Sequence, residues 1–124
     1  MATRQKKGQQ GELLAAEFLE RQGLRIASRN FRCPLGEIDL VAWDQETVVI
    51  VEVRSRYSKD FGLAQESVSV GKQQRLTRLG QWYLKQNRLE GRPARFDVIA
   101  IDWSGGEPRI TWIPNAFEAC PWCA

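Results

Sequence analysis

Two acidic residues stand on neighbouring strands of a predicted hairpin, at positions that would bring them face to face. Side chains alternate between the two faces of a strand, so Asp39 shares a face with Val41, and Glu52 shares a face with Ile50. A two-residue or four-residue turn around Gln45 sets a register in which Asp39 lies opposite Glu52. Opposed carboxylates repel each other unless they are solvated, protonated or bridged by a cation. Because Mg²⁺ and Mn²⁺ prefer oxygen ligands, the pair predicts a divalent-metal site that can take a substrate phosphate.

The same register allows a simpler interpretation, in which this face of the hairpin is exposed to solvent and Glu37 forms an ion pair with Arg54. A polar outer face is the default for antiparallel hairpins. However, Val48 and Ile50 lie on the same face as Glu52. A solvent-exposed face rarely carries so much apolar area, so we favour the cation.

The composition excludes several other chemistries. The chain has 124 residues and no His, which removes His general bases, Ser-His-Asp and Cys-His nucleophile systems and His-ligated metals. Its length suits a single domain, in which we expect residues 1–8 and 118–124 to be flexible tails. No apolar run approaches the length of a membrane span or a signal segment, and three Cys form no disulfide framework. We therefore expect a cytoplasmic protein without a membrane partner.

The elements that must position the two carboxylates follow from periodicity and turn signals. Apolar stripes with a helical repeat predict helices over residues 11–22 and 70–87. Runs of β-branched or alternating residues predict strands, at residues 24–31, 36–43, 47–54, 95–103 and 109–113. The order αβββαββ predicts an α/β fold with a central mixed β-sheet flanked by helices.

The net charge of +3 conceals a strongly patterned charge distribution. Residues 37–52 carry five acidic side chains and no basic one, residues 1–36 carry seven basic and three acidic, and residues 53–96 carry ten basic and three acidic. Basic stretches on both sides of an acidic block would gather a phosphodiester backbone by counterion release. The candidate nucleic-acid-binding residues are Arg29, Arg32, Arg54, Arg56, Lys59, Lys72, Arg75 and Arg78. Tyr57 and Phe61 could stack on bases, although ordinary loop packing is the simpler interpretation.

Several motifs together resemble a nuclease superfamily. Gly36-Glu-Ile-Asp39, followed by Val51-Glu-Val-Arg54, resembles the PD-(D/E)xK motif. The chain as a whole is similar to the YraN family, small bacterial proteins regarded as predicted endonucleases related to archaeal Holliday junction resolvases. The matching stretches are Gly8-x-x-Gly-Glu12, Asn30-x-Arg32, Gly36-Glu-Ile-Asp-Leu-Val-Ala42, Val51-Glu-Val-Arg-x-Arg56, Arg95-Phe-Asp-Val-Ile-Ala100 and Asn115-Ala-Phe117.

The resemblance implies a restriction-endonuclease-like core and a Mg²⁺-dependent hydrolysis of DNA phosphodiesters, on branched or damaged DNA, in a protein that could be a homodimer. It implies Glu12, Asp39 and Glu52 as metal ligands, although stabilisation by the helix dipole is a simpler interpretation of Glu12. Arg54 occupies the usual Lys position of the motif, and Arg can hold a phosphate but cannot act as a base. Lys72 could reach the site instead, so the catalytic set is Asp39 and Glu52 with Arg54 or Lys72.

Two other functions stay open: a nucleic-acid-binding module that does not cut, and a non-enzymatic protein-interaction domain. The remaining features favour structural interpretations. Cys120 and Cys123 form a CxxC pair near the last residue, which is typical of a frayed tail more than of a redox or zinc site. The five Trp are expected to pack in the core or at sheet edges, and Asp97 and Asp102 to be solvated at the ends of a strand.

Overall fold

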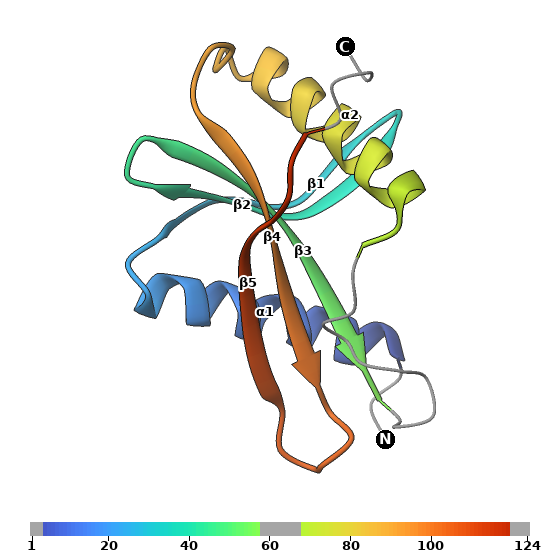
Figure 1. Ribbon diagram of the computed structural model, residues 1–124. Coiled ribbons are helices and arrows are strands. Elements are labelled where there is room, and N and C mark those ends of the chain that lie inside the picture. The colour runs from blue at the N-terminus through green and yellow to red at the C-terminus, as the bar shows by residue number, and fades with distance from the viewer. Residues whose placement is uncertain (1–3, 58–67, 120–124) are drawn as a thin grey trace.

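The structure, a computed structural model, describes residues 4–57 and 68–119 (Figure 1). Its elements are α1 (Arg4–Arg21), β1 (Arg25–Cys33), β2 (Gly36–Asp44), β3 (Thr47–Arg56), α2 (Val70–Gln86), β4 (Ala94–Asp102) and β5 (Arg109–Phe117). This order confirms the predicted α/β fold with the sequence αβββαββ. Within the described residues, no helix is long and apolar enough to cross a membrane.

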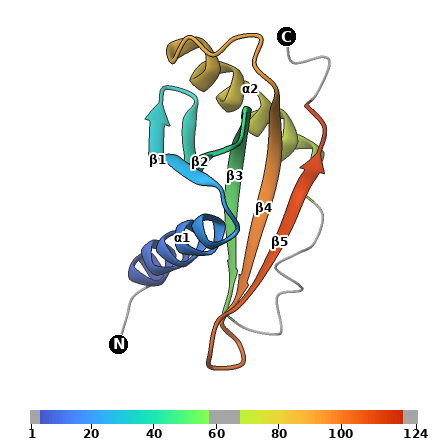
Figure 2. The ribbon, with the colours of Figure 1, turned by 90° about the vertical axis from the view of Figure 1, so that its left-hand side faces the viewer.

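A five-stranded mixed sheet in the order β1-β2-β3-β4-β5 forms the centre of the molecule. β1, β2 and β3 form an antiparallel meander, and β4 and β5 form an antiparallel hairpin. β3 and β4 are parallel, so the chain must cross over between them, and α2 lies in that connection. Figures 1 and 2 show α2 toward the end of the sheet where β4 begins and α1 toward the end where β4 finishes.

The two faces of the sheet are covered by different helices. Leu40 and Val51 belong to the cluster that packs against α1, whereas Val41 and Ile50 belong to the cluster that packs against α2. Since both faces of β3 are covered, residues 48–52 are all buried, the pattern expected of a strand with a parallel neighbour. The interpretation of the Glu52 face as solvent-exposed is therefore wrong.

The helix and strand bounds differ from the predicted ones mainly at two places. α1 begins at Arg4 and not at Gly11, because the Gln and Lys residues before Gly11 are good helix formers. Gly11 has another role: a Cβ there would lie 3.2 Å from Ser55 Oγ, so the glycine lets α1 approach β3 closely. β5 continues past Pro114 to its end at Phe117, which an edge strand tolerates.

The expectation that Asp97 is solvated at the end of a strand is wrong, because this residue is only 1 % exposed. Its Oδ1 accepts hydrogen bonds from the Asn115 N–H at 2.8 Å and from Arg95 Nε at 3.0 Å. Its Oδ2 accepts from Trp112 Nε1 at 2.9 Å and from Arg95 at 3.2 Å. Asp97 therefore fastens β5 to β4 at a point where their register shifts between Phe96 and Val98. Strand periodicity could not indicate this, since Trp112 and Asn115 come from a later strand.

We expect Asp97→Ala to lower the free energy of unfolding by about 3–5 kcal/mol, because it removes the acceptor of the half-buried Trp112 indole and of the Asn115 N–H and leaves Arg95 with Asp44 as its remaining partner. Urea denaturation would measure the change. Asp102→Ala is the matched control, since the Asp102 carboxylate accepts only local hydrogen bonds from Ser104 among those described and should matter little. Equal destabilisation by the two variants would contradict the proposed role of Asp97.

Candidate metal and phosphate site

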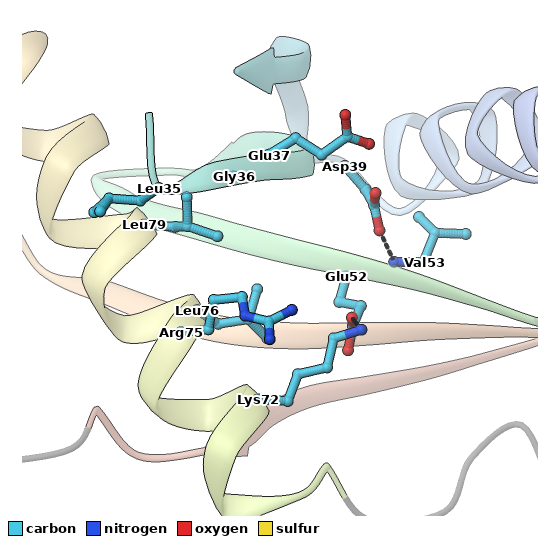
Figure 3. A pocket seen from close by; sticks show the side chains of 10 residues that line it. All are labelled: Leu35, Gly36, Glu37, Asp39, Glu52, Val53, Lys72, Arg75, Leu76 and Leu79. Atoms are coloured by element: carbon cyan, nitrogen blue, oxygen red, sulfur yellow. Dashed lines mark hydrogen bonds and ion pairs between the residues drawn. The ribbon is translucent and has the colours of Figure 1, made fainter. Parts of the chain in front are cut away.

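One pocket gathers most of the predicted catalytic residues (Figure 3). It has a volume of about 410 Å³ and lies between the start of β2, the middle of β3 and the first turns of α2. It is lined by Leu35, Gly36, Glu37, Asp39, Glu52, Val53, Lys72, Arg75, Leu76 and Leu79. The pocket thus combines three carboxylates with two cationic side chains, the composition that a metal and a phosphate would require together.

Asp39 lies where β2 and β3 begin to diverge. The predicted register is confirmed for the paired part of the hairpin, where Leu40 lies opposite Val51. One residue further, the Asp39 Oδ2 atom accepts a hydrogen bond from the Val53 N–H at 2.8 Å. The carboxylate replaces a backbone carbonyl as the acceptor, so Asp39 is held against β3 next to Glu52.

The surroundings of Asp39 disfavour its charged form. The pKa of Asp39 is raised from 3.8 to about 6, mainly by burial and in smaller part by the nearby carboxylates of Glu12, Glu52 and Glu37. The Val53 N–H opposes these effects, because it stabilises the carboxylate. A cation that binds here would displace a proton at mildly acidic pH and relieve repulsion at neutral pH.

Glu12 and Glu37 complete a compact group of carboxylates with Asp39. One carboxylate oxygen from each residue lies within 4.8 Å of the others. Glu12 stands well inside α1, whose first turn contains no acidic residue, so the helix-dipole interpretation of Glu12 is wrong. Burial raises the pKa of Glu12, whereas a hydrogen bond from Asn30 lowers it. Asn30, with a φ of 52° in β1, orients Glu12, a role that was not predicted from the sequence.

The surroundings of Glu37 differ from those predicted from the hairpin register. The Glu37–Arg54 ion pair of the alternative interpretation is wrong, because Glu37 Oε2 lies 3.2 Å from Arg32 Nε and Glu37 pairs with Arg32 across β1 and β2. Arg54 lies opposite Ala100 in the parallel β3–β4 ladder. The hairpin register could not reveal this, since the β2–β3 ladder has ended before Glu37 and β2 continues alongside β1 only.

Glu52, on β3, lines the same pocket as Asp39. It is 6 % exposed, its Oε1 forms an ion pair with Lys72 Nζ, and its buried Oε2 has no hydrogen-bond partner among the described residues. Lys72 is placed by the start of α2, where the Ser69 Oγ accepts a hydrogen bond from the Lys72 N–H at 3.2 Å. A buried carboxylate oxygen without a partner is costly, and a cation in the pocket would provide one.

The donor set fits a hard divalent cation. The oxygens of Glu12, Glu37 and Asp39 are close enough to share one ion, and Glu52 lines the same pocket as Glu37 and Asp39. Mg²⁺ and Mn²⁺ bind such oxygens and keep sites for water and substrate phosphate. The structure therefore brings two of the three predicted ligands, Glu12 and Asp39, into one group with Glu37, while the third, Glu52, stands beside it with Lys72.

The predicted nucleic-acid-binding residues fall into three places. Lys72 and Arg75 line the pocket, and Arg78 follows them on the exposed side of α2. Arg29 and Arg32 are exposed on the edge strand β1, and Arg54 and Arg56 are half-buried near the end of β3. Lys59 lies outside the described residues, as do Phe61, Cys120 and Cys123. Tyr57 stacks on Trp103 with ring centroids 6.4 Å apart, which favours the packing interpretation for this residue.

Comparisons with known proteins agree with these motifs. A family model described as "Uncharacterised protein family UPF0102" matches residues 11–101. A UPF0102 protein of Moorella thermoacetica is 49% identical over 111 residues, which cover 90% of this chain and 92% of the relative. A UPF0102 protein of Pseudomonas aeruginosa is 48% identical over 116 residues, covering 91% and 93%, and one of Syntrophotalea carbinolica is 42% identical over 115 residues, covering 93% and 94%. The resemblance to the YraN family, which is this same family, is confirmed.

Proposed function

The chain belongs to the uncharacterised protein family UPF0102, and we propose that it is a divalent-cation-dependent nuclease that hydrolyses DNA phosphodiesters, with branched or damaged DNA as its substrate. One observation carries the proposal: the buried Glu52, with an unpartnered oxygen, lines one pocket with Asp39, whose pKa is raised to about 6. Buried carboxylates that lie this close together lower the stability of the folded protein unless a bound cation neutralises their charge. The pocket opens beside cationic side chains that suit a phosphate.

Asp39 and Glu12 would hold Mg²⁺ or Mn²⁺, with Glu37 and Glu52 as the further oxygen donors of the site. A bound cation would supply an activated water and neutralise charge on the phosphate. The chain's own residues keep these donors in place. The Val53 N–H fixes Asp39, Arg32 fixes Glu37, and Asn30 fixes Glu12.

Lys72 is the residue that we propose for the role of the motif's usual Lys. Its ammonium group contacts Glu52 inside the pocket, whereas Arg54 is not among the residues that line the pocket. A Lys at this point can orient the attacking water and stabilise the charge that develops on the phosphate. Arg54 would then contribute to DNA binding by contacting phosphates outside the pocket.

The direct test is cleavage of linear, forked and four-way DNA by the wild-type protein, with Mg²⁺ or Mn²⁺ titrated from zero. We expect cation-dependent cleavage that favours the branched substrates. Glu46→Gln is a suitable control, because Glu46 is an exposed carboxylate in the β2–β3 turn and should not alter the cation dependence. Absence of cleavage of all three substrates at saturating cation would contradict the nuclease proposal.

A second candidate is a nucleic-acid-binding module that does not cut. The Glu52–Lys72 ion pair favours it, because Lys72 already neutralises one of the carboxylates that the nuclease needs. This candidate predicts salt-dependent DNA binding that needs no cation and is accompanied by no cleavage. Measuring binding and cleavage on the same substrates separates the two.

A further inference from the structure

The outward side of α2 carries an exposed indole that the fold does not require. Trp82 is 40 % exposed, whereas Trp43, Trp103 and Trp112 pack against the two core clusters. The expectation that the five tryptophans pack in the core or at sheet edges therefore holds for those three and is wrong for the exposed Trp82, and Trp122 lies outside the described residues. Its Nε1–H donates a hydrogen bond to Gln86 Oε1 at 3.1 Å, so the orientation of the ring is fixed within the helix.

The surface around this indole is concave. A hollow of about 340 Å³ is lined, among the described residues, by Trp82, Lys85 and Gln86. It therefore combines an aromatic face with an ammonium group and an amide. Base stacking on an aromatic side chain needs such a face, and the adjoining phosphate needs a cation.

The same side of α2 is cationic along its length. Arg75, Arg78, Trp82 and Lys85 follow each other at spacings of three or four residues, so they form one exposed stripe. α2 contains no acidic residue, and none of the ion pairs among the described residues involves Arg78 or Lys85. The stripe starts at the pocket that contains Asp39 and Glu52, because Arg75 is one of the residues that line that pocket.

The length of the stripe matches a short piece of nucleic acid. At about 1.5 Å per residue, Trp82 lies roughly 10 Å and Lys85 roughly 15 Å along α2 from Arg75. Stacked nucleotides advance about 3.4 Å each along one strand, so Trp82 would meet a base about three nucleotides from a phosphate held at the pocket. Membrane-binding helices bury a broad apolar face, and a single indole among cations does not provide one.

We propose that Trp82, Lys85 and Arg78 form a binding site for an unpaired nucleotide of the DNA strand that leaves the pocket along α2. The base stacks on Trp82, and Lys85 and Arg78 contact the neighbouring phosphates. An indole can stack only on a base whose face is free, so the site selects DNA with an unpaired nucleotide over intact duplex. The direction of the DNA strand along α2 rests on the proposed function. The inference goes beyond that function because it names an unpaired nucleotide as the feature of the DNA that is recognised.

The test measures binding without cleavage. Asp39→Asn protein is titrated into labelled DNA without divalent cation, and affinities are compared for a blunt duplex and for the same duplex with a short single-stranded overhang. Adding Trp82→Ala should weaken binding to the overhang DNA by about tenfold to a hundredfold and leave the blunt duplex nearly unchanged. Trp82→Phe, which keeps an aromatic face, should restore most of the preference. Lys85→Gln should weaken the overhang complex and reduce its salt slope by about one.

Equal effects of Trp82→Ala on both DNAs, or no effect on either, would overturn the inference, as would a Trp82→Ala defect confined to vesicle binding or self-association. The outcome is separable from that of the proposed function. Cleavage by the wild-type protein with no overhang preference refutes the nucleotide site alone. An overhang preference that depends on Trp82, in a protein that cuts no DNA, refutes the nuclease alone.

Discussion

Asp39→Asn is expected to slow cleavage by about a thousandfold and, at the same time, to stabilise the cation-free protein. The amide oxygen of Asn can still accept the Val53 hydrogen bond, so the local geometry is kept while the charge is removed. Loss of a metal ligand removes several kcal/mol of charge stabilisation, which corresponds to a rate reduction of about a thousandfold. If Asp39 only supported the fold, its substitution would instead lower the stability of the cation-free protein.

The stability gain follows from the pKa of Asp39, which is raised from 3.8 to about 6 in the folded protein. The folded state holds the proton more tightly than the unfolded state, so this contribution is fully present below about pH 4 and is lost as the pH rises through about 6. The loss amounts to about 3 kcal/mol, from a shift of about two units at 1.36 kcal/mol each. Without divalent cation, Asp39→Asn should therefore exceed the wild type in unfolding free energy at about pH 8 and match it at about pH 4.

Urea unfolding with chelator, and again with saturating Mg²⁺ or Mn²⁺, measures both effects. The cation should stabilise the wild type mainly above about pH 6, where Asp39 is ionised, and should have little effect on Asp39→Asn. Glu46→Gln, in the exposed turn, should respond to the cation as the wild type does. A wild-type protein whose stability is the same with and without cation at high pH would remove the metal site.

Lys72→Met is expected to reduce the cleavage rate by about a hundredfold to a thousandfold, the usual cost of losing a group that stabilises developing charge. Met keeps the length of the side chain without its ammonium group, so Glu52 loses its ion pair in the pocket. Arg54→Met should mainly weaken DNA binding, with less than a tenfold change in the rate at saturating DNA, since Arg54 does not line the pocket.

The comparison of the two variants decides which residue replaces the motif's usual Lys. Single-turnover cleavage at saturating DNA separates rate from binding, and unfolding curves at the same cation concentration confirm that both variants are folded. Lys72→Arg, which retains the charge but cannot become neutral, tests whether the group acts as a proton carrier. A large rate loss in Arg54→Met with an unaffected Lys72→Met would reverse the assignment.

Much of the fold and part of the site could be predicted because they depend on neighbouring residues in the chain. The β-branched run at 47–53 and the short polar turn at Gln45 and Glu46 determine the β2–β3 register, and this register brings Asp39 and Glu52 close together. The PD-(D/E)xK-like spacing depends on the same hairpin. The place of Lys72 was predictable as well, since it belongs to the first turn of a helix with a Ser cap.

The sequence by itself determined the element order, the hairpin and the presence of carboxylates and cations with no His. Only the tertiary structure decided that Glu37 joins the carboxylates of Glu12 and Asp39, that Asp97 is a buried acceptor, and that Trp82 faces solvent. The physical reason is that these three outcomes depend on contacts between segments far apart in the chain. Strand and helix periodicities assign a side chain to a face, but the residues that cover that face come from elsewhere in the sequence.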